Sequence, residues 1–255
     1  MAIRLLMATL TTAFGHAAFA EDPWVGMYGG ITATTFKSAI SGTTLKADGT
    51  VGSNASDEAA KNLRDETSGV GLFIGVRKRL DSRLIVGVEA DGARLAYDAR
   101  TQTDVSAGPY AGQPAATLHY QAPWLATARV LAGWSFGDVL VFGSGGAAFS
   151  TEKVTRTQYQ AVPATTLTAA QFSETDRVNR FGHALGAGLE WRWSKPWALR
   201  AEYMHARFPA ENFSFPDARG GAQGSYTSVQ GRVATNGMHL NSLRVGVTYT
   251  FGAGR

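Results

Sequence analysis

The chain lacks cysteine altogether and carries few charged residues, and each shortage excludes a class of protein. Without cysteine there is no disulfide framework, no thiol nucleophile and no Cys-ligated zinc, iron–sulfur or c-type haem site. Charged residues make up 17% of the 255 residues, whereas an average soluble domain has roughly 25%. The net charge of +4 is too small and too scattered for a nucleic-acid-binding protein. The composition therefore points away from an ordinary cytosolic enzyme.

Long uncharged apolar runs are missing everywhere except at the N-terminus. Arg4 is followed by an uncharged stretch over residues 5–20, which ends in the small-x-small cleavage pattern of Ala18 and Ala20. A membrane-spanning helix needs about twenty predominantly apolar residues, and this stretch is shorter and interrupted by polar residues. We therefore predict a secretory signal peptide at 1–20 and a mature domain at 21–255, rather than an N-terminal membrane anchor.

What the chain does have is alternation of apolar and small or polar residues with a period of two, which is typical of β-strands. The clearest case is the last segment, where the apolar positions are Leu243, Val245, Val247, Tyr249 and Phe251. Eight segments show the pattern, and we predict strands at about 24–35, 68–79, 84–97, 124–136, 139–150, 181–193, 197–208 and 240–251.

The connections between these segments alternate strictly between short and long. The short ones are tight turns at 81–82, 137–138 and 194–196. The long polar ones are at about 37–67, 98–123, 151–180 and 209–239. Short turns at one end and long loops at the other are typical of bacterial outer-membrane barrels. We predict an all-β, eight-stranded antiparallel transmembrane up-and-down β-barrel with four long extracellular loops, in the outer membrane of a Gram-negative bacterium.

Strand parity separates the outward side chains from the inward ones. A soluble lipocalin-like barrel would bury the apolar face, whereas a membrane barrel turns that face to lipid, and the placement of the charges favours the membrane barrel. The outward face is predicted to carry an interfacial aromatic girdle near the short turns, formed by Trp24, Trp134, Trp191, Trp193, Trp197, Tyr249 and Phe251.

The inward face receives four positive and four negative side chains. This predicted lumen ion network consists of Glu89, Asp91, Arg129, Glu190, Arg192, Arg200, Glu202 and Arg244. Counting back from the 194–196 turn places Glu190 directly opposite Arg200, where opposite charges attract. Because an eight-stranded barrel is just wide enough to be filled by side chains, we expect the network to plug the lumen. The alternative is a charged constriction that selects solutes.

Short motifs in every segment except the second resemble a known family, the small eight-stranded outer-membrane barrels that include the OmpA-like, opacity-protein-like and porin-family proteins. The matching pieces lie at 24–30, 86–91, 124–133, 145–148, 186–190, 202–203 and 243–251. The resemblance implies surface-exposed roles such as envelope integrity, adhesion, contact with a host or with lipopolysaccharide, and in some relatives haem binding or pore activity. Two departures are Leu131, where relatives often have arginine, and the four residues that follow Phe251.

Few residues offer catalytic or ligand chemistry. His205 and Ser242 are neighbours on adjacent strands but face opposite sides, so they form no catalytic pair, and His183 and His205 form only an outward-facing diagonal pair. His119 and Tyr120, in the second predicted loop, are an unspecific signal for haem. We predict no catalytic residues, no cofactor, no metal site and no enzymatic activity. The basic residues Arg77, Lys78, Arg79 and Arg83 bracket a turn, where we expect them to be solvated or to touch lipid phosphates.

The expected function is therefore structural and interactive, with adhesin-like contacts through the four loops. The expected partners are outer-membrane lipid and lipopolysaccharide, the outer-membrane assembly machinery through the C-terminal strand, and a host or environmental ligand at the loops, but no nucleic acid. A small porin is the first alternative, and a haem- or ligand-binding receptor or a lipid A-modifying enzyme is the second.

Overall fold

The computed structural model describes residues 24–50, 61–104, 111–112, 114–162, 166–220 and 228–251. The predicted signal peptide and the residues after Phe251 lie outside these ranges. In the described part of the chain, no helix is long and apolar enough to cross a membrane.

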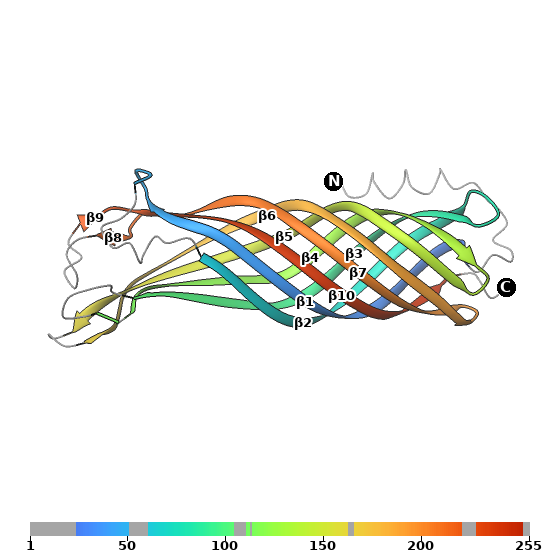
Figure 1. The fold of residues 1–255 in the computed structure, drawn as a ribbon, viewed down its shortest axis with the longest axis horizontal. Coiled ribbons are helices and arrows are strands. Elements are labelled where there is room, and N and C mark those ends of the chain that lie inside the picture. Colours follow the sequence, from blue (N-terminus) through green and yellow to red (C-terminus); the bar gives the residue numbers. More distant parts are fainter. Residues whose placement is uncertain are drawn as a thin grey trace, which may run out of the picture.

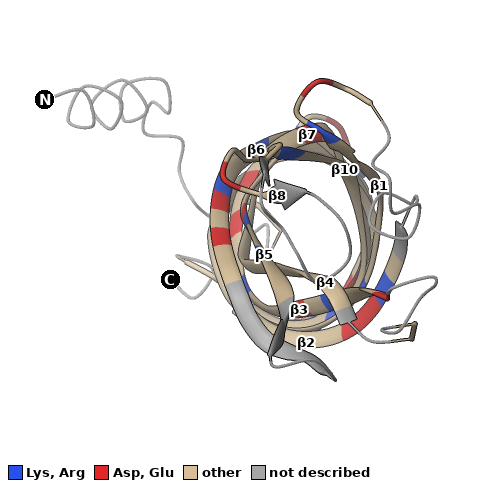
Figure 2. Ribbon diagram, turned by 90° about the vertical axis from the view of Figure 1, so that its left-hand side faces the viewer, with Lys and Arg blue, Asp and Glu red and all other residues tan. Residues whose placement is uncertain are grey.

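Eight long antiparallel strands form one closed ring, in the order β1-β10-β7-β6-β5-β4-β3-β2 (Figures 1 and 2). They are β1 (Gly26–Lys46), β2 (Lys61–Arg79), β3 (Leu84–Asp104), β4 (Pro114–Phe136), β5 (Val139–Val162), β6 (Thr166–Ser194), β7 (Trp197–Phe215) and β10 (Arg232–Thr250). A separate two-stranded sheet consists of β8 (Arg219–Gly220) and β9 (Ser228–Val229). The eight-stranded, up-and-down, all-β prediction is thereby confirmed.

Three tight connections gather at one end of the barrel, which we call the short-turn end (Figure 1). They join β2 to β3, β4 to β5 and β6 to β7 at the predicted positions. Gly137 has a φ of +62°, which a glycine adopts without strain in the two-residue turn that it forms with Asp138. The predicted strand boundaries are therefore close to the structure at this end.

The opposite ends of the strands lie far beyond their predicted boundaries. Most of the predicted loops at 37–67, 98–123, 151–180 and 209–239 are continuous β-strand. In β3 the inward parity never changes, but the apolar residues change face: Val88 is outward and exposed, whereas Leu95 and Tyr97 are inward and buried. The alternation therefore reverses its sense within one strand, and the sequence reads this reversal as a strand end.

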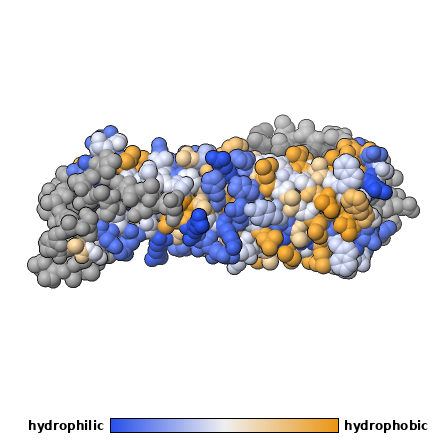
Figure 3. All heavy atoms as spheres, in the orientation of Figure 1, coloured by the Kyte–Doolittle hydropathy of each residue, from blue (hydrophilic) through white to orange (hydrophobic). Residues whose placement is uncertain are grey.

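This reversal divides the barrel into two parts, which Figure 3 shows as an orange half and a bluer half. In the half next to the short turns, which we call the membrane half, the outer surface is apolar and exposed. Its outward residues include Ile31, Val70, Leu72, Val130, Leu185, Leu243 and Val245. In the other half, which we call the projecting half, the outer surface is polar and the interior holds the larger apolar core together with a few buried polar side chains.

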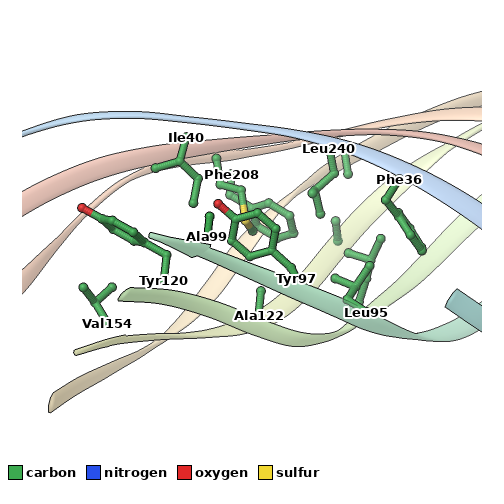
Figure 4. Close-up of a cluster of buried hydrophobic side chains, with 14 of the residues drawn as sticks. Phe36, Ile40, Leu95, Tyr97, Ala99, Tyr120, Ala122, Val154, Phe208 and Leu240 are labelled. Carbon is green, nitrogen blue, oxygen red and sulfur yellow. The ribbon is translucent and has the colours of Figure 1, made fainter. Parts of the chain in front are cut away.

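The interior of the projecting half is a packed core between two four-stranded sheets (Figure 4). Pairing of β2 with β3 ends at Gly71 opposite Ala93, and pairing of β6 with β7 ends at His183 opposite Arg207. Above these points one sheet is β2-β1-β10-β7 and the other is β3-β4-β5-β6. The core between them includes Phe36, Ile40, Leu95, Tyr97, Leu118, Tyr120, Val154, Met204, Phe208, Phe213, Phe215, Met238 and Leu240.

Two of the ladder irregularities lie where the two halves meet. The register shifts between Arg94 and Tyr97 in the β3–β4 ladder, and between Gln121 and Leu125 in the β4–β5 ladder. Pro123 lies inside the second irregularity, where it has no N–H group to donate to a ladder. Bulges of this kind increase strand twist and bend the sheet, which accommodates the change from barrel to paired sheets.

The closed ring has a measurable consequence for refolded 21–255. Because every strand of the membrane half is hydrogen-bonded on both edges, the barrel should resist detergent at room temperature and unfold only on boiling. Boiled and unboiled samples should therefore run at different positions in detergent gel electrophoresis. Identical mobility of the two samples would contradict the closed barrel.

Candidate functional site: the buried charge cluster in the membrane half

Arg200 on β7 is the central cation of the interior of the membrane half. Its guanidinium donates to Glu89 at 2.5 and 2.9 Å, to Glu202 at 3.1 Å and to Glu190 at 3.4 Å. The carbon at its centre lies 4.7 Å from the ring centroids of both Phe73 and Phe142. Glu190 is the ladder partner of Arg200, but the shorter hydrogen bonds run across the lumen to Glu89.

Arg129 on β4 is a second cation in contact with three acids. It donates to Glu89 at 2.7 Å, to Asp91 at 3.0 Å and to Glu202. Its ladder partners are Glu89 on β3 and Gly146 on β5, and a side chain at Gly186 would approach both its guanidinium and the Glu202 carboxylate at about 3 Å. Glycine on the neighbouring strands therefore provides the space that these long side chains occupy.

Two further arginines complete the cluster. Arg244 on β10 donates to Asp91 at 2.9 Å. Arg77 on β2 donates to both Glu190 oxygens, at 2.8 and 2.5 Å, and lies 3.6 Å from the ring centroid of Tyr28. The Tyr28 hydroxyl in turn donates to Glu89 at 2.8 Å.

We refer to these eight charged residues as the charge cluster: Arg77, Glu89, Asp91, Arg129, Glu190, Arg200, Glu202 and Arg244. All eight are buried, and four guanidinium groups balance four carboxylates. A buried charge is costly without a partner, so this equality is what allows the group to exist inside the barrel. Arg200 and Arg129 link acids that come from β3, β6 and β7, so the contacts hold several walls of the barrel together.

The structure places Arg192 and Arg77 differently from the sequence interpretation. Arg192 lies at the short-turn end and pairs with Asp138, outside the charge cluster, because only the turn separates it from solvent. Arg77 was grouped with the basic residues around the first turn, yet it is buried and pairs with Glu190. Its parity with Phe73 and Gly75 on β2 was the signal that could have placed it inside.

The aromatic residues at the short-turn end require one correction. Trp134, Trp191, Trp193, Trp197 and Phe251 are exposed on the outer surface, and Tyr249 packs edge-on against Trp197 and Phe251. Trp24 is buried, and its indole N–H donates to the Gly137 carbonyl at 3.0 Å. Trp24 shares the inward parity of Tyr28, so its side chain closes the interior at the short-turn end instead of facing lipid.

A second set of exposed aromatics marks the other edge of the apolar surface, and the sequence interpretation did not single it out. It consists of Trp124, Phe149, Phe181 and Tyr203. The rings of Phe149 and Phe181 meet edge-on with centroids 5.2 Å apart. Two aromatic borders enclosing an apolar band are typical of barrels that cross an outer membrane.

A smaller buried polar group lies in the projecting half and was also not predicted. Arg180 donates to Glu152 at 2.5 Å, to the Pro209 carbonyl at 2.8 Å and to Asn236. Asn236 also donates to Glu152 at 3.1 Å. Arg180 fell inside a predicted loop, so no strand parity was available to place it.

The candidate catalytic and ligand residues do not assemble. Ser242 is buried and donates to the Met204 carbonyl, whereas His205 faces outward and contacts the Asn241 side chain at 2.8 Å. His205 lies 6.0 Å from His239, measured between ring centroids, and His239 is a neighbour that the sequence interpretation missed. Among the described residues there is no group of three or more side chains suited to hold a metal ion.

His119 and Tyr120 lie on β4 and point in opposite directions. His119 contacts the Asp98 carboxylate at 2.6 Å on the outer surface, and Tyr120 is part of the buried core of the projecting half. They therefore offer no shared site for a haem, and both are in a strand instead of the predicted loop.

A closed eight-stranded ring with an apolar outer band, two aromatic borders and a charged interior defines a transmembrane β-barrel of the outer-membrane class. A family model described as the outer membrane protein beta-barrel domain matches residues 6–251. The chain belongs to this family, and it is an outer-membrane protein of a Gram-negative bacterium.

Solved structures with a similar fold include several small outer-membrane proteins. OprG from Pseudomonas aeruginosa is 14% identical with a TM-score of 0.52, and the match covers 88% of this chain and 95% of that one. Ail of Yersinia pestis, solved with the heparin analogue sucrose octasulfate, is 12% identical with a TM-score of 0.42 over 88% and 99%. The protease OmpT from Escherichia coli is 10% identical with a TM-score of 0.43 over 89% and 97%. At these identities the likeness concerns the fold alone, and no curated protein matches the chain.

Removing the central cation tests how far the charge cluster stabilises the barrel. Arg200→Ala should lower the free energy of unfolding by about 3–5 kcal/mol, because it leaves Glu89 buried without its main partner. The matched control is Arg177→Ala, at an exposed position on β6, which should change it by no more than about 0.5 kcal/mol. Urea unfolding of both variants in detergent micelles measures the difference, and equal losses would show that the cluster is energetically unimportant.

The Asp98–His119 contact on the outer surface of the projecting half predicts that the stability of the fold depends on pH. Desolvation opposes the shift, but hydrogen bonds from His119 and Gln121 lower the pKa of the Asp98 carboxyl. A carboxyl whose pKa is lower in the folded state stabilises the fold at pH values above its unfolded-state pKa. This stabilisation is lost as the pH falls through the folded-state pKa. Wild type should therefore exceed Asp98→Asn in stability near neutral pH, and the two should converge below about pH 4.

Urea midpoints for both proteins across that range provide the measurement. A difference that stays constant into acid would contradict the assignment.

Proposed function

We propose that this protein is a non-conducting outer-membrane barrel whose role is structural and interactive, with adhesin-like contacts made by its projecting half. The observation that supports the proposal is that the charge cluster and the inward apolar side chains of the projecting half are buried. In the membrane half the charge cluster occupies the lumen as a neutral plug, and in the projecting half an apolar core fills the space between the two sheets.

Two different plugs in series argue against the small porin. Passage of an ion would require a wet path past Arg200 and Glu89, whose atoms are in direct contact. It would then require a second path through the buried apolar core that contains Phe36, Tyr97 and Phe208. Water and ions are excluded from a packed apolar interior, so opening one plug leaves the other in place.

The receptor and enzyme alternatives have less support. A lipid A-modifying enzyme would need a nucleophile and a base at one rim, and Ser242 and His205 lie on opposite faces of the wall. A haem or metal receptor would need converging ligands, which His119 and the His205–His239 pair do not provide. We therefore propose that the protein is not an enzyme and carries no cofactor.

The proposed partners follow from the outer surface. Outer-membrane lipid and lipopolysaccharide would contact the apolar band between the two aromatic borders, and the assembly machinery would bind the C-terminal strand β10. With its short turns in the periplasm, the barrel would hold the polar surface of the projecting half outside the cell. This surface would meet a host or environmental ligand.

Single-channel conductance of refolded 21–255 in a planar bilayer tests the proposal. Wild type should be silent, and Arg200→Ala should also be silent, because the apolar core still closes the projecting half. The gel-mobility assay verifies that each sample is folded. Steady openings of wild type, altered in Arg200→Ala, would support the porin instead.

A further inference from the structure

Histidines gather on one part of the outer surface, at the border of the apolar band farther from the short-turn end, which we call the upper border. Three of the chain's five histidines, His183, His205 and His239, lie on the neighbouring strands β6, β7 and β10. All three face outward, with His183 exposed and the other two half-buried. On β6 the exposed apolar side chains of Phe181 and Leu185 flank His183, so the histidines adjoin the lipid-facing surface.

Arg207 on β7 lies at the centre of this group and is exposed. Its ladder partner on β6 is His183, and its ladder partner on β10 is His239. Ladder partners have Cβ atoms about 5 Å apart, so an imidazole stands on each side of the guanidinium. His205 precedes Arg207 on the same face of β7, and its ring centroid lies 6.0 Å from that of His239. We refer to His183, His205, Arg207 and His239 as the rim patch.

Hydrogen bonds orient one imidazole of the rim patch. The side-chain oxygen of Asn241 accepts a hydrogen bond from the Tyr203 hydroxyl at 2.9 Å and contacts Nδ1 of His205 at 2.8 Å. Because an amide oxygen can only accept, Nδ1 of His205 carries the proton in this contact. Nε2 of His205 is therefore the nitrogen that can take up a further proton and donate it to an anion.

Acidic partners of the rim patch are missing from the part of the chain that the structure describes. The other ladder partners of its members are Ala39, Ala147, Leu185 and Asn241. Glu66 on β2 pairs with Lys37 on β1 at 3.5 Å, and among the described residues no ion pair joins Glu211 to Arg207. Adjacent basic side chains without a carboxylate repel one another once they are protonated, and an anion relieves this repulsion.

We propose that the rim patch binds the phosphate group of a lipid headgroup in the outer leaflet of the membrane. Guanidinium and imidazole N–H groups form charge-assisted hydrogen bonds with phosphate oxygens. The position of the patch selects a lipid as the source of the phosphate, because the apolar side chains of Phe181 and Leu185 adjoin His183. Acyl chains of the same lipid lie on the apolar band while its headgroup meets Arg207 and the flanking imidazoles.

The inference deepens the proposed function and rests on it in one respect only, that the projecting half lies outside the cell. The upper border then faces the outer leaflet, where lipopolysaccharide is the proposed partner. The proposed function assigns lipid to the apolar band all around the barrel. The rim patch adds recognition of a headgroup on one side of it, at β6, β7 and β10.

A pair of lipids that differ only in phosphate tests the site. The probe is phosphorylated lipid A, and the comparison lipid is lipid A from which the phosphate groups have been removed. Titration calorimetry with refolded 21–255 in uncharged detergent micelles measures both affinities. The phosphorylated form should bind at least about ten-fold more tightly, because only it can accept charge-assisted hydrogen bonds from the rim patch.

A double substitution within the rim patch supplies the decisive variant. Arg207→Gln combined with His239→Gln should weaken the binding of phosphorylated lipid A by about ten-fold. The matched control is Lys153→Gln with Arg177→Gln, which removes an outward ladder pair of cations farther from the apolar band on β5 and β6. It removes at least as much positive charge and should change the affinity by less than about two-fold, since screening weakens distant exposed charges.

Gel mobility establishes that both variants are folded. Equal losses of affinity in the two variants would show a diffuse attraction to positive charge and would overturn the site.

The imidazole resonances in nuclear magnetic resonance spectra report the contact directly. His119 lies on β4 in contact with Asp98, outside the rim patch, and serves as an internal reference. Phosphorylated lipid A should shift the resonances of His183, His205 and His239 and leave those of His119 unchanged. An equal shift with inorganic phosphate at the same concentration, or equal binding of the two forms of lipid A, overturns the inference. Since neither result alters conductance, failure here leaves the non-conducting barrel standing.

Discussion

The structure depends on one constraint, that no backbone hydrogen-bonding group can be left unpaired in contact with lipid. Closing eight strands into a ring meets this requirement in the membrane half, where every ladder is complete. Water can satisfy an open edge beyond the apolar band, and the β2–β3 and β6–β7 ladders end at the upper border of that band, beside Val70 and Phe181. The end of the β2–β3 and β6–β7 ladders therefore marks the outer limit of the membrane-spanning part, as the apolar band of outward side chains also does.

Closing a ring of eight strands creates an interior that must be filled, and the two halves fill it in opposite ways. Where the outside is lipid, the inside holds Arg200 and its partners; where the outside is water, the inside holds Phe208 and its neighbours. Each strand carries both patterns, so a single chain combines a membrane barrel with a water-facing pair of sheets. Pro123 and the bulges beside it mark the level at which one arrangement gives way to the other.

Much of the membrane half can be predicted from the sequence, because period-two alternation and tight turns are local signals. The eight strands, the short-turn end and the Glu190–Arg200 register all follow from counting residues. The projecting half cannot be found in the same way, because its apolar face is inverted and its strands read as polar loops. Ion pairs across the lumen, such as Arg77 with Glu190, also cannot be predicted from the sequence. The strands β2 and β6 are not neighbours in the ring, and local parity carries no information about distance across it.

The alternation that builds the wall also matters before the wall exists. An outer-membrane protein must first pass through the inner membrane as an extended chain, where a long apolar helix would be retained by the bilayer. In this chain the lipid-facing residues are interleaved with Glu190, Arg200, Arg244 and many glycines, so no segment after residue 20 is apolar enough to stop there. The alternating pattern thus lets the chain cross the inner membrane and insert into the outer one. A continuous apolar surface forms only once the strands have paired.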